Sequence, residues 1–166
     1  MPQIKYLLMD VDGTLTDGKI YMSNGGELMK AFHVRDGCGI HDLLIPAQVI
    51  PVIFTGRNSL IVENRCREIG ISEVFQGITN KEKYLEEWVK DKCIIYSNIA
   101  YIGDDINDFY IMQLVKNAGG IIGCPADAVD KVKEVADFVA ENKGGNGAVR
   151  DFIEWLFCEG FISPLV

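Results

Sequence analysis

Short apolar runs recur along the chain and alternate with segments of mixed polarity. Each run is apolar at nearly every position, which is typical of strands in parallel sheets, because both faces of such a sheet are buried. These predicted strands cover residues 4–9, 49–54, 99–102 and 120–122. Between them, residues 59–69 and 81–89 carry apolar side chains at helical spacing, with charges on the opposite face. The alternation predicts an α/β fold, a doubly wound, Rossmann-like parallel sheet with its site at the carboxyl ends of the strands.

One segment, residues 19–34, departs from this alternation. Two strand-like runs, 20–22 and 28–32, flank the turn-forming sequence SNGGE, and this pattern predicts a β-hairpin that projects from the sheet. No linker or internal repeat divides the 166 residues, and about 150 residues is a usual size for one domain. We therefore expect a single domain, 1–166.

Charge and composition exclude several classes of function. The formal net charge of −8 opposes binding to nucleic acid or to an anionic membrane surface. The longest apolar runs fall far short of the roughly 18 residues that span a membrane, and residues 1–5 lack the features of a signal peptide. The five cysteines are odd in number and widely spaced, which favours free thiols. We expect a cytoplasmic protein with a small-molecule partner, and neither nucleic acid nor membrane as a partner.

The most specific chemical signal is the segment DVDGT at residues 10–14. Asp10 and Asp12 stand where the first buried strand opens into a loop. A calcium-binding loop would need a glutamate at its twelfth position, where this chain has Tyr21. Further polar residues follow later predicted strands or begin a helix: Thr55, Lys81 and the segment GDDIND at 103–108. Three predicted strand ends therefore converge on acidic and hydroxyl-bearing side chains.

In this order, the four motifs resemble those of the haloacid dehalogenase superfamily of phosphotransferases. The resemblance implies that Asp10 attacks a phosphoryl group and forms an aspartyl phosphate, which water then hydrolyses. It implies Mg²⁺ as the cofactor, held by the carboxylates of Asp10 and Asp104 and by the backbone carbonyl of Asp12. It also implies that Asp12 protonates the leaving alkoxide and then deprotonates the attacking water.

The other motif residues support this chemistry in the family. Thr55 and Lys81 are expected to bind the phosphoryl oxygens. Asp108 is expected behind the metal ligands rather than on the metal. Asp105 is also expected behind the metal ligands, and direct contact of Asp105 with the metal is left open.

Position 12 and the motif spacing favour a phosphatase. The transport ATPases of the superfamily have threonine where this chain has Asp12. Only 45 residues separate Asp10 from Thr55, and 26 separate Thr55 from Lys81. These intervals leave no room for a cap domain, so water is poorly excluded and hydrolysis is favoured over phosphomutase chemistry.

Within the superfamily, longer segments resemble the capless phosphatases of 3-deoxy-D-manno-octulosonate 8-phosphate, a 2-keto-3-deoxy sugar acid phosphate. These segments are residues 12–21, 32–40, 55–57 and 144–150. The resemblance implies a role in lipopolysaccharide biosynthesis and a homo-oligomer, a tetramer whose hairpins pack together. It also implies that the apolar tail, residues 157–166, reaches a neighbouring site. The glycines within 144–147 are interpreted as a turn or helix cap beside the site, not as a dinucleotide loop.

Two alternatives for the substrate stay open. Arg57, Arg35 and Asp36 are the expected substrate contacts and favour the eight-carbon octulosonate; the guanidinium of Arg57 suits a carboxylate, although a surface salt bridge is its alternative. A neighbouring group of the superfamily hydrolyses nine-carbon, sialic-acid-type nonulosonate 9-phosphates. Segment 124–128 looks closer to that group, and Thr14 departs from the valine that is usual in the octulosonate family. Asp36 is also a candidate cap for the helix that follows it.

An alternative from another class is a catalytically silent regulatory or binding subunit of the same fold. Such a relative usually loses one of the reacting residues. This chain keeps Asp10, Asp12, Lys81 and Asp104, which favours an enzyme.

Overall fold

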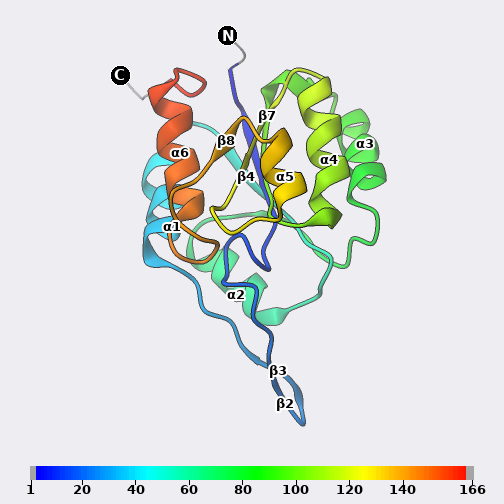
Figure 1. Cartoon of the computed structure of the whole chain (residues 1–166), viewed down its shortest axis with the longest axis vertical. Coiled ribbons are helices and arrows are strands. Elements are labelled where there is room, and N and C mark those ends of the chain that lie inside the picture. Colours follow the sequence, from blue (N-terminus) through cyan, green and yellow to red (C-terminus); the bar gives the residue numbers. More distant parts are fainter. Residues whose placement is uncertain (1–2, 164–166) are drawn as a thin grey trace.

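The computed structural model describes residues 3–163 and contains a parallel sheet with helices on both faces (Figure 1). The strand order is β5-β4-β1-β6-β7-β8, and every neighbouring pair is parallel. The strands are β1 (Tyr6–Met9), β4 (Ile50–Phe54), β5 (Glu73–Phe75), β6 (Ile99–Ile102), β7 (Ile121–Cys124) and β8 (Phe138–Val139). The predicted doubly wound α/β fold is confirmed.

The two helical layers follow from the alternation of side chains along each strand. Leu7 and Met9 of β1 join the core beneath α1, α2 and α6, whereas Leu8 joins the core beneath α3, α4 and α5. The helices are α1 (Val34–Cys38), continued by a π-helical turn (Gly39–Leu44), α2 (Leu60–Glu68), α3 (Lys81–Asp91), α4 (Ile106–Asn117), α5 (Asp130–Val135) and α6 (Ala148–Cys158). A short 3₁₀ turn, Tyr96–Asn98, precedes β6.

The sheet is wider than the apolar runs predict. Four strands are expected from these runs, but the described residues form six, with β5 and β8 at the edges. β5 is only partly buried and β8 has two residues, so neither forms the continuous apolar run of a central strand. Some strands also begin or end at other residues than predicted: β1 begins at Tyr6 instead of residue 4, and β7 ends at Cys124 instead of residue 122.

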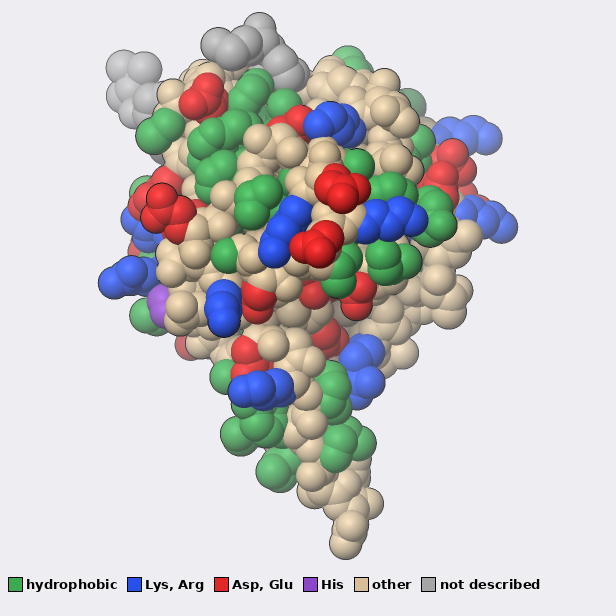
Figure 2. All heavy atoms as spheres, viewed as in Figure 1, with side chains coloured by type: hydrophobic (Ala, Val, Ile, Leu, Met, Phe, Trp, Pro, Cys, Tyr) green, Lys and Arg blue, Asp and Glu red, His purple; other side chains and the backbone are tan. Residues whose placement is uncertain are grey.

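A separate two-stranded antiparallel sheet forms the predicted hairpin, β2 (Tyr21–Ser23) and β3 (Gly26–Met29). It projects away from the main sheet (Figure 1). Hydrophobic side chains gather on and around it in Figure 2; the exposed ones are Ile20, Met22, Leu28 and Met29. β3 ends earlier than the expected run 28–32, because the chain turns inward at Lys30, whose side chain is buried.

The C-terminal tail follows its own subunit as far as it is described. α6 ends near Gly160, which has a φ of +75°. The chain then turns back: Phe161 packs against the core, and Ile162 is buried in it. Phe161 and Ile162 of the tail therefore pack on their own subunit. Contact of the tail with a neighbouring site stays a prediction, and residues 164–166 lie outside the described residues.

All five cysteines are free. Within residues 3–163, no helix is both long and apolar enough to cross a membrane.

Candidate active site

Three adjacent strands end at one edge of the sheet, and each is followed by a predicted site residue. Asp10 follows β1, Thr55 follows β4, and Asp104 stands two positions after β6. β1 lies between the other two strands, and its last residue, Met9, pairs with Ile102, the last residue of β6. The parallel register therefore brings the motifs together.

Lys81 lies buried between two carboxylates at this edge. Its Nζ donates hydrogen bonds to Asp10 Oδ1 and to Asp108 Oδ1, each at 2.6 Å. Asn80 caps the start of α3, so the first turn of this helix carries Lys81 to the strand ends. Because a buried ammonium is stable only when it is paired, the two carboxylates and the lysine form one interdependent cluster.

Asp108 is fully buried and accepts hydrogen bonds at both oxygens. Its Oδ1 accepts from Lys81 and, at 2.7 Å, from the Tyr101 hydroxyl. Its Oδ2 accepts from the backbone N–H groups of Asp104 and Asp105, at 3.0 and 3.3 Å. With its lone pairs used in this way, Asp108 is better suited to orienting its neighbours than to binding a metal. This supports the position expected for Asp108 behind the metal ligands.

Asp105 has a structural task that its motif alone does not reveal. It is the N-cap of α4, with its Oδ1 accepting a hydrogen bond from the N–H of Ile106 at 2.6 Å and Asp108 completing a capping box. Its side chain is exposed. The expected place of Asp105 behind the metal ligands stays a prediction.

Carboxylate oxygens of Asp10, Asp104 and Asp108 lie within 4.8 Å of one another. The Thr14 hydroxyl donates to Asp104 Oδ1 at 3.0 Å. A Cβ added to Gly13 would lie 2.1 Å from Asp104 Oδ2, and Gly13 has a φ of +97°, so this position requires glycine. A compact set of oxygen donors that includes Asp10 and Asp104 suits Mg²⁺.

The carboxylates carry more negative charge than Lys81 balances. Burial raises the pKa of Asp10 well above its usual range, the charge of Asp108 raises it further, and Lys81 opposes both effects. Burial, with a further contribution from Asp108, raises the pKa of Asp104 to about 7. A divalent cation between Asp10 and Asp104 would stabilise their ionised forms, so the residues present fit a metal ion.

Asp12 lies outside this buried cluster. Its carboxylate forms an ion pair with Lys30, which follows β3 at the base of the hairpin. Burial lowers the pKa of Lys30, but Asp12 and Glu27 outweigh burial and hold the pKa above its ordinary value. Sequence reasoning missed Lys30, because a lysine at the end of a predicted hairpin strand normally faces solvent. It also missed Tyr101, although a phenol in an otherwise apolar strand next to an acidic motif could have drawn attention.

The expected phosphate and substrate contacts differ in burial. Thr55 is buried, and its backbone N–H donates to the carbonyl of Phe75 at 3.1 Å. Arg57, two residues further on, and Arg35, near the start of α1, are both exposed. Their roles toward a ligand stay predictions.

Asp36 is buried and holds another helix in place. Its Oδ1 accepts a hydrogen bond from the N–H of Arg150 at 2.9 Å. The N-cap of α6 is Gly147, which has no side chain to cap the helix, so Asp36 supplies that oxygen from α1. This corrects the expectation that Asp36 caps the helix following it in sequence. Its predicted contact with substrate stays a prediction.

The glycine-rich segment packs directly on the DVDGT loop. The N–H of Gly145 donates to the carbonyl of Thr14 at 3.0 Å. A Cβ at Gly144 would lie 1.8 Å from the carbonyl oxygen of Gly13. The segment is therefore a turn and helix start beside the site, as the sequence predicts.

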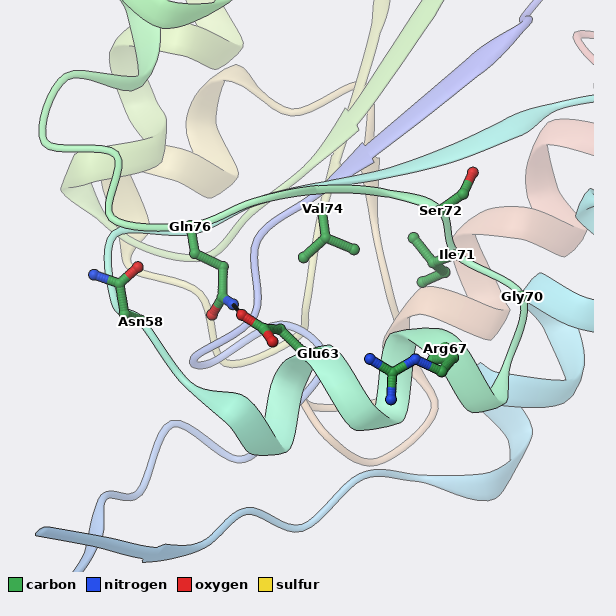
Figure 3. Close-up of a pocket in the computed structure, with 8 residues that line it drawn as sticks. All are labelled: Asn58, Glu63, Arg67, Gly70, Ile71, Ser72, Val74 and Gln76. Atoms are coloured by element: carbon green, nitrogen blue, oxygen red, sulfur yellow. Dashed lines mark hydrogen bonds between the residues drawn. The ribbon is translucent and has the colours of Figure 1, made fainter.

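The surface has two grooves of interest, one close to the carboxyl ends of the strands and one at the β5 edge of the sheet. One, of about 430 Å³, opens beside Lys81 and the starts of α3 and α4. Another, of about 570 Å³, runs between α2 and β5 and contains none of the predicted site residues (Figure 3). Its floor carries a 3.0 Å hydrogen bond from Gln76 to Glu63. Lys81 lines the first groove and links it to the carboxylate cluster, whereas the groove in Figure 3 lies at the β5 edge of the sheet.

A doubly wound sheet with buried carboxylates and a buried lysine at its strand ends is an arrangement typical of an α/β enzyme. The chain belongs to the haloacid dehalogenase-like hydrolase family, whose model matches residues 54–153. It is 41% identical over 153 residues to the 3-deoxy-D-manno-octulosonate 8-phosphate phosphatase KdsC of Escherichia coli K12, covering 92% of this chain and 79% of that protein.

Solved structures agree with this assignment. One is the cobalt-bound deoxy-D-mannose-octulosonate 8-phosphate phosphatase of Haemophilus influenzae, with a TM-score of 0.86 and 36% identity, covering 95% of this chain and 89% of that one. Another is the 3-deoxy-D-manno-octulosonate 8-phosphate phosphatase of Moraxella catarrhalis in complex with magnesium, phosphate and KDO. Its TM-score is 0.86 and its identity 36%, covering 95% of this chain and 87% of that one.

Proposed function

We propose that this chain is a Mg²⁺-dependent phosphatase that hydrolyses a 2-keto-3-deoxy sugar acid phosphate, namely 3-deoxy-D-manno-octulosonate 8-phosphate. The observation that carries the proposal is the buried cluster of Asp10, Lys81 and Asp108 with Asp104 beside it. The 41% identity to KdsC over nearly the whole chain supports the substrate. We further propose that residues 1–166 act as a single catalytic domain.

In the proposed reaction, one carboxylate oxygen of Asp10 attacks phosphorus, and the bond from phosphorus to the sugar oxygen breaks. Asp12 gives its proton to the leaving sugar oxygen. It then takes a proton from water, whose oxygen attacks the aspartyl phosphate and restores Asp10. Lys81 and Thr55 orient and neutralise the phosphoryl oxygens. Asp10, Asp104 and the backbone carbonyl of Asp12 would hold Mg²⁺, which when bound lowers the repulsion between the carboxylate and the phosphate.

We expect Mg²⁺ to stabilise the protein more at pH 8 than at pH 5.5. The pKa of Asp104 rises from 3.8 to about 7 in the fold, so without metal its contribution to stability is present below pH 4 and is lost as pH rises through 7. Mg²⁺ competes with this proton and binds the ionised form. At one hundred times its Kd, Mg²⁺ stabilises by about 2.7 kcal/mol, or roughly 5–10 °C in Tm for a chain of this length.

Thermal unfolding with and without Mg²⁺ at both pH values measures this difference. Asp104→Asn is the matched variant, and its Mg²⁺-dependent rise in Tm should largely disappear. Equal rises at the two pH values would show that Asp104 does not exchange a proton for the metal.

The experiment that tests the function is a steady-state comparison of eight-carbon and nine-carbon keto-acid phosphates, with p-nitrophenyl phosphate as a simple ester. We expect the highest kcat/KM for octulosonate 8-phosphate. The alternative, a nine-carbon nonulosonate 9-phosphate, is favoured by segment 124–128, and a higher kcat/KM for that substrate would establish it. No phosphate release from any ester would favour the silent regulatory subunit.

Arg57→Ala in the same assay tests the exposed guanidinium. If Arg57 binds the sugar-acid carboxylate, kcat/KM should fall about tenfold or more for octulosonate 8-phosphate and much less for p-nitrophenyl phosphate, which lacks that carboxylate. Equal losses on both substrates would place Arg57 at the phosphate or in the scaffold.

We also propose a homotetramer in the cytoplasm. The exposed hydrophobic side chains of the hairpin support assembly, because an isolated two-stranded ribbon leaves such surface uncovered in water. The five free cysteines are compatible with a reducing compartment. Light scattering should give four times the 18.5 kDa chain mass; a monomer would contradict the proposed assembly.

A further inference from the structure

The base of the hairpin reaches into the active-site loop through Lys30. The side chain of Lys30 is 1% exposed, and its Nζ pairs with the Asp12 carboxylate and lies 3.0 Å from Glu27 Oε1. Within residues 3–163, no other side chain forms an ion pair or hydrogen bond with Asp12. A buried lysine with its long stem ordered is costly, so this placement indicates a specific task.

Glu27 extends the contact to a second strand-end loop. Its Oε2 accepts a hydrogen bond from the hydroxyl of Ser59. The same hydroxyl caps α2 by accepting from the N–H of Val62 at 3.3 Å. Ser59 lies two residues after the exposed Arg57, in the loop that follows β4. A chain of polar contacts thus links the loop after β1, the hairpin and the loop after β4.

We infer that Lys30 is a positioning residue that holds the Asp12 carboxylate in the orientation from which it exchanges protons with the sugar oxygen and with water. The inference rests on the proposed function, in which Asp12 is the acid and base. It assigns the hairpin a part in the chemistry of its own subunit, separate from any part in assembly.

The charges around Asp12 explain why such a residue is needed. The carboxylates of Asp10 and Asp104 lie close together in the neighbouring buried cluster, and a third, unrestrained carboxylate would be free to turn toward the same cation and leave the leaving group unprotonated. Lys30 opposes that rotation by attracting Asp12 to the hairpin side. Glu27 in turn fixes Lys30, which otherwise has a flexible four-carbon stem.

Lys30→Met removes the ammonium but keeps an apolar stem in the buried position. For octulosonate 8-phosphate, we expect kcat to fall about 30-fold or more, as a share of the roughly 10²–10⁴-fold that a positioned acid or base supplies, with KM changed less than about threefold. Lys30→Arg should recover part of the loss, because it restores a cation. The matched control is Lys19→Met on the same hairpin. Lys19 is exposed and 3.7 Å from Asp17, and its loss should leave kcat unchanged.

A double-mutant cycle with Asp12→Asn separates positioning from a general structural role. If Lys30 acts through Asp12, adding Lys30→Met to Asp12→Asn should lower kcat less than about threefold further. A full additional loss, or a loss confined to KM, would overturn the inference and indicate direct substrate contact. Wild-type kcat in a folded Lys30→Met enzyme would overturn it as well.

Two further measurements keep the test independent of folding and of the substrate. If Lys30→Met unfolds, Glu27→Gln/Lys30→Met restores the charge balance and should show the same loss of kcat. Melting temperatures of Lys30→Met, Asp12→Asn and the double variant test the pair without turnover: the two decreases should combine to less than their sum, and additive decreases would contradict the pairing. Inactive wild-type enzyme would instead refute the proposed function.

Discussion

Asp10→Asn is expected to abolish phosphate release, by roughly a thousandfold or more in kcat. Asparagine keeps the size of the side chain but loses the anion that attacks phosphorus, and it is a poorer ligand for Mg²⁺. The variant should fold, because burial and the neighbouring Asp108 already disfavour the ionised form of Asp10. We therefore expect its Tm without Mg²⁺ to equal or exceed that of the wild type at pH 8.

Phosphate release at saturating Mg²⁺ and substrate measures the loss. Asp17→Asn is the matched control, because Asp17 is an exposed aspartate at the far end of the same loop and should keep its activity. Near-normal turnover in Asp10→Asn, with its melting curve intact, would rule out Asp10 as the nucleophile.

Lys81→Met is expected to produce the largest loss of stability. It leaves Asp10 and Asp108 buried without their shared cation, and removing one partner of a buried ion pair costs about 3–5 kcal/mol. For a chain of this length, the melting temperature should fall by roughly 10 °C. In the wild type, Lys81 stays charged at neutral pH, because the two carboxylates outweigh the effect of burial and raise the pKa of Lys81 above its ordinary value of 10.5.

The loss should depend on pH, because Asp10 can relieve the missing charge by binding a proton. The folded pKa of Asp10 already lies above its ordinary value because of burial and the charge of Asp108, and loss of Lys81 removes the opposing effect, so the variant is most stable at low pH and loses stability as pH rises. Thermal unfolding without metal at pH 5 and pH 8 should show the larger decrease at pH 8. Lys83→Met is the matched control, because Lys83 lies on the same helix at the surface, 4.0 Å from Glu87. The melting temperature of this control should change little at either pH. An equally small change in Lys81→Met would show that the buried cluster does not need its cation.

The predicted fold was correct where burial acts on both faces of a strand. β1, β4, β6 and β7 lie inside the sheet and have the apolar runs that reveal them. β5 and β8 were missed because an edge strand needs fewer apolar residues, and its pairing comes from backbone hydrogen bonds that leave no side-chain pattern. The turn signal at SNGGE located the hairpin, but not the residue at which its second strand ends.

The structure brings several of the predicted motif residues together, but sequence reasoning missed some of their partners. Asp10 and Asp104 could be placed because parallel strand ends meet at one edge of the sheet, and Lys81 could be placed by the order and spacing of the motifs. Lys30 and Tyr101 could not, because their contacts with Asp12 and Asp108 depend on how the hairpin and β6 approach the loops in three dimensions. Asp36 shows the same limit: its partner, the N–H of Arg150, lies 114 residues away.

The most direct test of the account is to identify the residue that receives the phosphoryl group. In Asp12→Asn, p-nitrophenyl phosphate should still phosphorylate the enzyme, because its leaving group needs no acid, whereas hydrolysis of the aspartyl phosphate should be slow. Quenching this variant in acid and reducing it with borohydride converts an aspartyl phosphate to homoserine. Mass spectrometry should find homoserine at position 10 alone; a reduced residue elsewhere, or a burst of p-nitrophenol without any reduced aspartate, would contradict the mechanism.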